Sequence, residues 1–528
     1  MALNLNIPAL KDDPIIIAET RPQRISQKLE ILHSRNPLDI AAHLHGELEI
    51  LNRQRVSPST RVQALDAYRA VLINTAHTLA EDYSNAALPL HDKAKLAASA
   101  TESLWLELGY GYKLALVDLQ NQLIKLGTDK TSAHAIQRAM HAVAEHATVY
   151  YQTYFSPPEH IWGDLHQLYF CAVKLGIQNI KIAAEKSVET SNAAFSTSIE
   201  STYKHALLMS LADPQHLTQK NVRLAAEYLA FHVEDARISA VAPLEVTTSS
   251  FIVNLTSNKP PIPYSKQKDA PNPDVDILLQ TLDLVIGIHQ DLNTLQSNQL
   301  PKNGGIPANA NIDEYIDLLT YLIKHWGLTQ KRIFNRTQTN GDIELVSGLP
   351  AIYQVANNNT SNNVENIKSA NATTQENAQP AIHPSRWHII NISAVGMSVR
   401  RHPTAEKNIR IGGLIGFKSK DEQNWSLGLV RWASCGSKDR LDIGVQIIAS
   451  RVQSAMVRIG NSQYDEMALL LPEIVAVKQL ATIVARVGTY EPARQISVTY
   501  NGNTHLIMLT KLVERSHLFE RIQYSVIS

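Results

Sequence analysis

The 528-residue chain, with 44% hydrophobic residues, is long enough to bury several cores and to form roughly two to four domains. Its 49 basic side chains equal its 49 acidic ones, which excludes a global field that attracts nucleic acid, so we expect no DNA or RNA partner. Two cysteines, Cys171 and Cys435, are too few for a disulfide framework or a cysteine-rich metal site, and we expect no metal.

The sequence shows neither an export signal nor a membrane-spanning segment. Residues 1–8 lack the basic start and the apolar core of roughly 7–15 residues that export requires. No later segment reaches the roughly 18 consecutive apolar residues needed to cross a bilayer, and the longest candidate, 275–288, is interrupted by Asp276, Gln280 and Asp283. These features predict a cytoplasmic protein.

The first part of the chain is rich in helix signals. We expect an extended or irregular N-terminus over 1–22 and an all-helical domain over 23–237, with the topology of its helices left open. Ser57-Pro58 illustrates the pattern, because a capping hydroxyl precedes a proline at the first helical position. The apolar residues that follow recur every three or four positions, which predicts one buried face: Val62, Leu65, Tyr68, Leu72, Ala76 and Leu79.

The composition changes after residue 237. Five prolines between 260 and 273 prevent regular helix, so 238–275 is interpreted as a proline-rich linker or covering strap. Apolar periodicity then returns over 276–327 and predicts two connecting helices, the second of which ends at Gly327.

Past residue 327 the pattern is that of short strands separated by glycine and polar turns. Residues 328–460 therefore predict a small all-β barrel, with 351–355 as one of its strands. An insertion at 356–383 is rich in Asn, Ser, Thr and Gln and is expected to be a mobile polar loop. Residues 461–528 are also β-patterned, with a hairpin turn at Asn501-Gly502, and predict a β extension or a second small barrel.

Two short motifs in this β-rich region carry the chemistry of a nucleotide site. Arg332 and Arg336 are four positions apart, and a planar guanidinium can fork onto a phosphate or a guanine edge and can stack on a ring. Asn391 and Ser393 are two positions apart, so on a strand they present polar groups on the same face. Gly396 lets the backbone turn or approach a ligand without a Cβ clash.

Together the motifs resemble the PilZ family, a bacterial family of cyclic di-GMP receptor domains, over about residues 330–455. The resemblance implies that Arg332 and Arg336 bind guanine and phosphate, and that Asn391, Ser393 and Gly396 form the contact on the barrel side. Residues 428–432 and 442–446 are similar to the later strands of the family. Asn391 lies 55 positions after Arg336, longer than the family usually allows, and removing the insertion 356–383 restores an ordinary spacing.

The leading hypothesis is a non-enzymatic effector in which the barrel binds cyclic di-GMP and the helical region contacts another protein. Its ligand is a second messenger, and no catalytic cofactor is expected. A ligand-independent adaptor with a degenerate barrel is the alternative. An enzyme in the helical region has no supporting constellation of residues, and the signature motifs of cyclic di-GMP cyclases and phosphodiesterases are absent from the sequence. The sequence leaves the partner, the process and the oligomeric state open.

Overall fold

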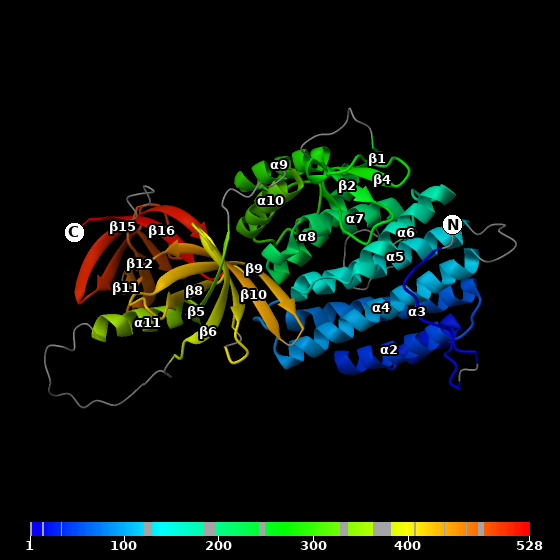
Figure 1. The fold of residues 1–528 in the computed structure, drawn as a ribbon, viewed down its shortest axis with the longest axis horizontal. Coiled ribbons are helices and arrows are strands. Elements are labelled where there is room, and N and C mark those ends of the chain that lie inside the picture. Colours follow the sequence, from blue (N-terminus) through cyan, green and yellow to red (C-terminus); the bar gives the residue numbers. More distant parts are fainter. Residues whose placement is uncertain are drawn as a thin grey trace. The chain divides into compact units, whose positions relative to one another are not determined.

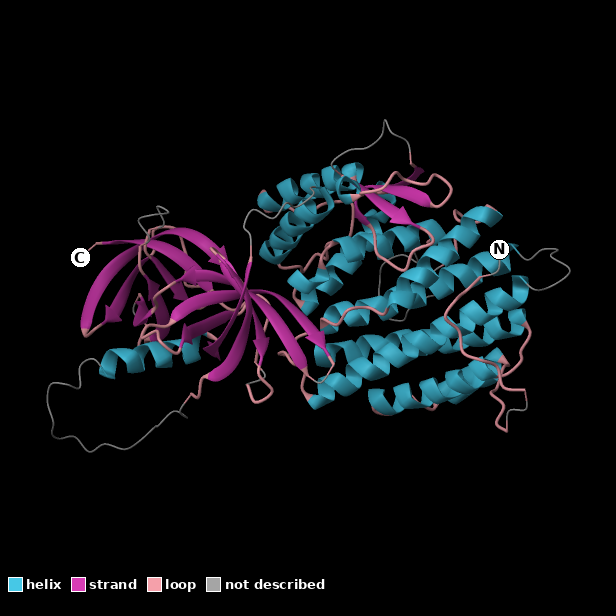
Figure 2. Ribbon diagram, in the orientation of Figure 1, coloured by secondary structure: helices cyan, strands magenta, loops and turns pink. Residues whose placement is uncertain are grey.

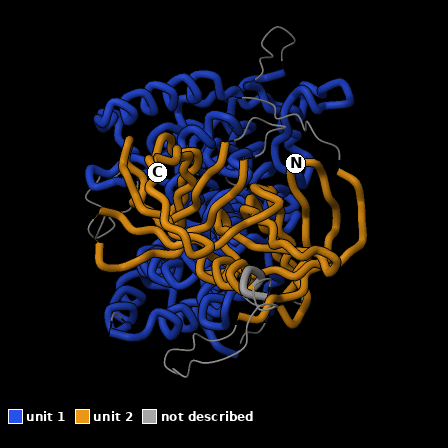
Figure 3. Tube along the Cα trace, turned by 90° about the vertical axis from the view of Figure 1, so that its left-hand side faces the viewer, with its two compact units in different colours: residues 1–86, 90–331 blue, residues 87–89, 332–528 orange. Residues whose placement is uncertain are grey.

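The chain forms two compact units, Met1–Ala86 with Leu90–Lys331 and Arg332–Ser528 with Ala87–Pro89 (Figure 3). The short Ala87–Pro89 segment groups with the second unit because Leu88 and Ile409 exchange backbone hydrogen bonds of 2.8 and 3.1 Å. The computed structural model describes residues 3–12, 15–32, 34–120, 129–183, 197–241, 249–327, 336–362, 382–405, 408–437, 439–460, 462–473 and 480–527. Within these ranges no helix is both long and apolar enough to cross a membrane.

Helices make up most of the first unit, and α3, α4 and α5 pack side by side (Figures 1 and 2). The α-helices are α1 (Pro22–Glu30), α2 (Pro37–Arg53), α3 (Pro58–Tyr83), α4 (Asp92–Gln120), α5 (Asp129–Thr153), α6 (Glu159–Leu175), α7 (Ile199–Leu211), α8 (Gln219–His232), α9 (Leu282–Gln296) and α10 (Ile312–Gly327). Short 3-10 turns are η1 (Pro214–His216), η2 (Val233–Asp235) and η3 (Tyr264–Lys266).

Helix α3 begins where the sequence predicts. Ser57 is the N-cap, and its hydroxyl accepts a hydrogen bond from the Thr60 N–H at 3.4 Å. Pro58 occupies the first helical position, where no N–H is needed. All six residues of the predicted apolar face are buried, which confirms the helical period.

The interpretation of 238–275 as a linker or strap differs from the structure. This region contributes to a four-stranded sheet of order β1-β4-β2-β3, all in the first unit. Its antiparallel strands are β1 (Arg237–Ala240), β2 (Ser250–Asn254), β3 (Ile262–Pro263) and β4 (Asp276–Gln280). The first five residues of 276–327 are therefore strand, because they pair with β1 and β2, and helix begins only at Leu282.

A buried ion pair joins three elements of the first unit. Lys113 on α4 donates to Asp164 on α6 at 2.6 Å, and both side chains are at most 3% exposed. Asp164 also accepts the Asn6 N–H at 2.9 Å, which fixes the N-terminal segment. Burial lowers the pKa of the Lys113 ammonium, and the carboxylate of Asp164 opposes that shift. The pair is therefore a structural contact whose members depend on each other.

Replacing Lys113 by Met should destabilise the helical unit by about 3–5 kcal/mol, because it leaves a buried carboxylate without its counter-charge. Urea unfolding of the full chain, followed by the helical circular dichroism signal, measures this loss. Lys130→Met, at an exposed position on α5, is the control and should leave the midpoint unchanged. An unchanged midpoint for Lys113→Met would show that Asp164 is satisfied without the lysine.

Within the described residues, the second unit consists of two closed six-stranded barrels and one helix, so the predicted order of a helical N-terminal region followed by a β-rich C-terminal region is confirmed. The first barrel has the order β10-β7-β6-β5-β8-β9 and the second β11-β12-β13-β16-β15-β14. Strands of the first barrel are β5 (Thr337–Ser347), β6 (Ser385–Ser393), β7 (Gly396–Arg401), β8 (Leu414–Ser419), β9 (Ser426–Gly436) and β10 (Arg440–Ala449). Those of the second are β11 (Gln453–Ile459), β12 (Glu466–Leu471), β13 (Thr482–Ala485), β14 (Gln495–Tyr500), β15 (Asn503–Arg515) and β16 (Glu520–Val526).

The second barrel resolves the choice that the sequence left for the C-terminal residues. It starts at β11, so 453–459 belongs to it rather than to the first barrel. Asn501 and Gly502 have φ of 48° and 79° and connect β14 to β15, as the predicted hairpin turn requires.

The prediction of a strand at 351–355 is wrong, because these residues lie in helix α11 (Leu349–Asn362). Ile352, Val355 and Ala356 are spaced by three and one and lie on one buried face of the helix. Residues 356–362 of the predicted polar loop are thus helical, 363–381 lie outside the described residues, and 382–384 lead into β6.

Helix α11 lies beside strands of both barrels (Figure 1). It helps to bury a core to which both barrels contribute. Ile352 and Val355 of the helix contact this core, which also contains Leu429 of the first barrel and Leu469 and Phe519 of the second. Each apolar side chain fully buried in such a core contributes about 1.5–3 kcal/mol. The two barrels and α11 therefore share one core.

Candidate functional site

The β6–β7 hairpin carries the second predicted motif. Ser393 pairs with Gly396 across a two-residue turn, and the Ser393 hydroxyl donates a 3.0 Å hydrogen bond to the Gly396 carbonyl. The Ile447 N–H donates to the Val395 carbonyl at 3.0 Å and fixes the turn to β10. The Ser393 hydroxyl thus stabilises the hairpin as a hydrogen-bond donor, and its oxygen can still accept a hydrogen bond.

Asn391 lies on the same strand, opposite Ser398 of β7. Its side-chain carbonyl oxygen is buried and has no hydrogen-bond partner within the described part of the chain. A buried acceptor left without a donor costs about 1–3 kcal/mol. A ligand N–H that donates to this oxygen would therefore remove the desolvation cost that the free protein carries.

Strand β5 brings the described end of the first motif, Arg336, toward the second. Thr337 pairs with Ile392 and Gln338 with Asn391, so Arg336, one residue before β5, continues the register to a position beside Ser393. Arg336 is two residues from Gln338, which places it on the face shared by Asn391 and Ser393. Arg336 is exposed, whereas Arg332 lies outside the described residues.

Gly396 has a packing role that the motif alone did not reveal. Its φ is not positive, and a Cβ built on it would lie 2.4 Å from the Val445 carbonyl oxygen of β10. Gly396 pairs with Gln446 on that strand. The absent side chain therefore permits the close approach of β7 and β10.

The register also brings together residues that were not predicted as site residues. The row that contains Asn391 and Ser398 continues through Gly444 of β10 to Trp432 of β9. A Cβ on Gly444 would lie 1.7 Å from the Trp432 indole nitrogen, so the indole ring lies directly over this glycine. A flat aromatic ring thus lies one strand beyond β7 on the face that carries Asn391. The sequence signal for the contact between Trp432 and Gly444 was a glycine at the centre of a predicted strand.

Ion pairs occupy the next row of the same face. Arg400 makes two hydrogen bonds of 2.7 and 2.9 Å to Asp442, which raise the pKa of the guanidinium. Arg386 and His388 both bond to Asp342, and these bonds lower the pKa of its carboxyl. Among the described residues, the positive charges of this row are already matched by carboxylates, whereas Arg336 is an exposed cation at the start of β5.

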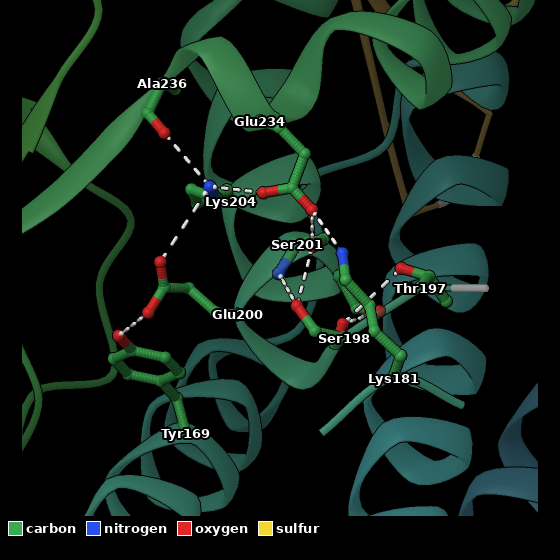
Figure 4. Close-up of polar contacts among 10 residues, drawn as sticks. Tyr169, Lys181, Thr197, Ser198, Glu200, Ser201, Lys204, Glu234 and Ala236 are labelled. Carbon is green, nitrogen blue, oxygen red and sulfur yellow. Dashed lines mark hydrogen bonds and ion pairs between the residues drawn. The ribbon is translucent and has the colours of Figure 1, made fainter. Parts of the chain in front are cut away.

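The helical unit contains a polar cluster that bears on the enzyme hypothesis, in which a buried lysine meets a carboxylate that is 55% exposed (Figure 4). Lys204 on α7, 3% exposed, donates to Glu234 and to the Ala236 carbonyl, both at 3.0 Å. Ser201 and Lys181 donate to the other oxygen of Glu234 at 2.6 and 2.9 Å. Burial raises the pKa of Glu234, but these hydrogen bonds outweigh it and lower that pKa to about 2.

Such a carboxylate stays ionised and already accepts three hydrogen bonds, so it is poorly suited to accept a proton near neutral pH. The Ser201 hydroxyl donates its hydrogen bond to the same carboxylate. The cluster joins α7 to the turn after α8 and has the properties of a structural contact. Within the ranges that the structure describes, no group of three or more His, Cys, Asp or Glu side chains could hold a metal ion.

Gly396→Ala should destabilise the first barrel by about 1–3 kcal/mol, because the added methyl group forces β7 away from β10. Thermal unfolding of the full chain, followed by the β-sheet signal, measures the effect in the absence of any ligand. Gly341→Ala on β5 is the control, since its Cβ would meet Ile389 at an ordinary 3.6 Å. Equal stability of the two variants would contradict the packing role of Gly396.

Comparison with known proteins finds similar domains along most of the chain. Residues 23–243 match the model described as the N-terminal domain of the cyclic-di-GMP receptor FimW, and residues 453–527 match its C-terminal beta-barrel domain. Residues 250–379 and 353–453 match the middle PilZ domain of that receptor. The chain is also 23% identical to the cyclic-di-GMP receptor FimW of Pseudomonas aeruginosa, over 99% of this chain and 93% of that protein.

The resemblance noted in the sequence is confirmed by these matches. The three models follow one another along the chain and together extend from residue 23 to residue 527. The last match coincides with the second barrel, and the middle match contains the first. The chain thus matches, in order along its length, the helical N-terminal domain, the middle PilZ domain and the C-terminal β-barrel domain of the FimW receptor.

Proposed function

We propose that this protein is a non-enzymatic effector that binds cyclic di-GMP on the outer face of its first barrel. The proposed contacts are Arg332, Arg336, Asn391, Ser393 and Gly396, the last through its backbone. The ligand is a second messenger rather than a substrate, and the proposal includes no catalytic cofactor. It retains the cytoplasmic location expected from the sequence.

One observation carries this proposal. Thr337 pairs with Ile392 and Gln338 with Asn391, so the start of β5, directly after Arg336, lies beside the hairpin although 55 positions of sequence separate Arg336 from Asn391. The adaptor hypothesis predicts that the arginine motif points away from this hairpin. Strand alternation favours the opposite arrangement for Arg336.

The chemistry of the face matches the ligand. An exposed guanidinium can fork onto a phosphate or onto the O6 and N7 acceptors of guanine. Asn391 offers an unsatisfied carbonyl oxygen, which can accept a guanine N–H. The hydroxyl of Ser393 gives its proton to Gly396, so its oxygen is better suited to accept from the base than to donate to a phosphate. Trp432 provides a flat surface on which a base can stack.

The output would pass through the helical unit to another protein. Helix α10 ends at Gly327, shortly before Arg332 in the sequence. Fixing the arginines on a ligand would therefore restrict the segment that follows α10 and shift the populations of the helical unit. The ligand can shift these populations only as far as it prefers one state over the other.

Calorimetry with cyclic di-GMP should give saturable binding to the full chain. Arg336→Ala should weaken it about 10- to 100-fold, because the loss of a forked arginine contact costs about 1–3 kcal/mol. Arg458→Ala removes a 53% exposed arginine from the second barrel and should bind like the wild type. The circular dichroism spectra of all three proteins should match.

A ligand-independent adaptor remains the second candidate, because Ser393 and Gly396 have complete structural roles without a ligand. The same titration separates the two functions. A folded wild-type protein that releases no heat and changes no spectroscopic signal with cyclic di-GMP would exclude the effector and leave the adaptor.

A further inference from the structure

A β-bulge in the first barrel presents an arginine at the border with the second barrel. Trp432 pairs with Gly444 and Val430 pairs with Val445, so Arg431 is the extra residue on β9. Bulges of this kind leave one residue unpaired and redirect its side chain. Arg431 is 44% exposed, although it lies between two residues of a closed sheet.

The side chain of Arg431 connects the two barrels. Its Nε donates to the Gln446 side-chain oxygen on β10 at 2.6 Å. Its Nη2 donates to Oε1 of Glu514 on β15, also at 2.6 Å. Glu514 is 19% exposed and pairs across the strands with Arg521, whose side chain is buried. A single guanidinium is thus held by one neutral group from its own barrel and one carboxylate from the other.

This contact lies in the same row as the proposed ligand contacts. Gln446 pairs with Gly396, and Gly396 pairs with Ser393. Neighbouring strands are about 4.8 Å apart, so the side chain of Gln446 begins within about 10 Å of the Ser393 backbone. Arg431 extends this row by one strand, on the side away from Arg336.

We propose that Arg431 is a further contact for the anionic part of the ligand, and that Glu514 of the C-terminal barrel competes for it. This inference rests on the proposed function and adds a residue pair outside the two motifs. In the free protein Glu514 holds Arg431. An incoming phosphate replaces this carboxylate, and Gln446 keeps the guanidinium in place during the exchange. Glu514 is a positioning residue, because it acts through Arg431.

The charges favour such an exchange. A phosphate oxygen and a carboxylate oxygen accept from the same guanidinium edge, and two anions that share it repel each other. The carboxylate that is displaced still faces Arg521, so it is not left without a neighbouring cation. A partly exposed ion pair contributes only about 0–1 kcal/mol to stability, which makes it easy to exchange.

Ligand binding would in this way reach the C-terminal barrel directly. Glu514 lies next to a bulge in the pairing of β15 with β16, where the register already shifts. Loss of the bond from Arg431 removes a contact that fixes this irregular segment to the first barrel. The expected result is a local loosening of β15 around residue 514.

Calorimetry with cyclic di-GMP on full-length variants tests the exchange. Arg431→Ala should weaken binding about tenfold, which corresponds to about 1.4 kcal/mol. Glu514→Gln should strengthen binding several-fold, because it removes the competing charge, and the double variant should bind no better than Arg431→Ala. Glu466→Gln is the control, since it removes a carboxylate from another ion pair of the second barrel, with Arg486.

Hydrogen exchange over β15 (Asn503–Arg515) adds a readout that a purely structural role would not change. Exchange near residue 514 should increase on ligand binding in the wild type and should be insensitive to ligand in Glu514→Gln. If the wild type binds but neither substitution alters affinity, or if Glu514→Gln weakens binding, this inference is wrong while the proposed function stands. Binding by Glu514→Gln but not by the wild type would support the competition, whereas no binding by the wild type or by any variant would reject both proposals.

Discussion

The antiparallel register of the first barrel is the constraint on which the candidate site depends. No turn connects β5 to β6, because α11 and the residues after it separate the two strands in sequence. Only the backbone pairs from Thr337 to Leu345 bring Arg336 to the hairpin. A shift of one residue would send the side chain of Asn391 to the other face. The buried Trp387 and Val399 oppose that shift, because they would move from the interior of the barrel to its outside.

Bulges adjust this register without breaking it. One bulge lies between Ile389 and Asn391 in the pairing of β6 with β7, and another places Arg431 outside the regular ladder of β9 and β10. Each adds a residue to one strand and changes the direction of the side chains that follow. Both bulges lie beside the rows that carry the proposed ligand contacts. The polar face thus results from irregular pairing within a barrel that is otherwise closed.

Local signals in the sequence were sufficient for elements whose determinants are close together. Ser57-Pro58 began a helix and Asn501-Gly502 made a hairpin, since each depends on the backbone preferences of adjacent residues. The prediction of a strand at 351–355 was wrong because five residues rich in Ile, Tyr and Val also fit a strand pattern. Its helical face becomes visible only when Ile352 and Val355 are seen against the shared core.

Contacts between distant segments explain the remaining differences. The strand at 276–280 has partners on both sides, β1 and β2, and no property of its own sequence reveals them. Asn391 and Ser393 could be proposed from their spacing and their resemblance to a PilZ motif, whereas Arg431 could not, because its partner Glu514 lies 83 positions later. The role of Gly396 also needed the structure, since only the position of Val445 distinguishes close strand packing from ligand approach.

The shared core limits how the second unit can respond to a ligand. Separating the two barrels would expose Leu429, Leu469 and Phe519, at about 1.5–3 kcal/mol for each side chain. A ligand that gains a tenfold preference for one state supplies only about 1.4 kcal/mol. Binding on this face therefore cannot drive the barrels apart. It can exchange a partly exposed ion pair such as Arg431–Glu514, whose cost is of the same size as the preference, while the core keeps both barrels in register.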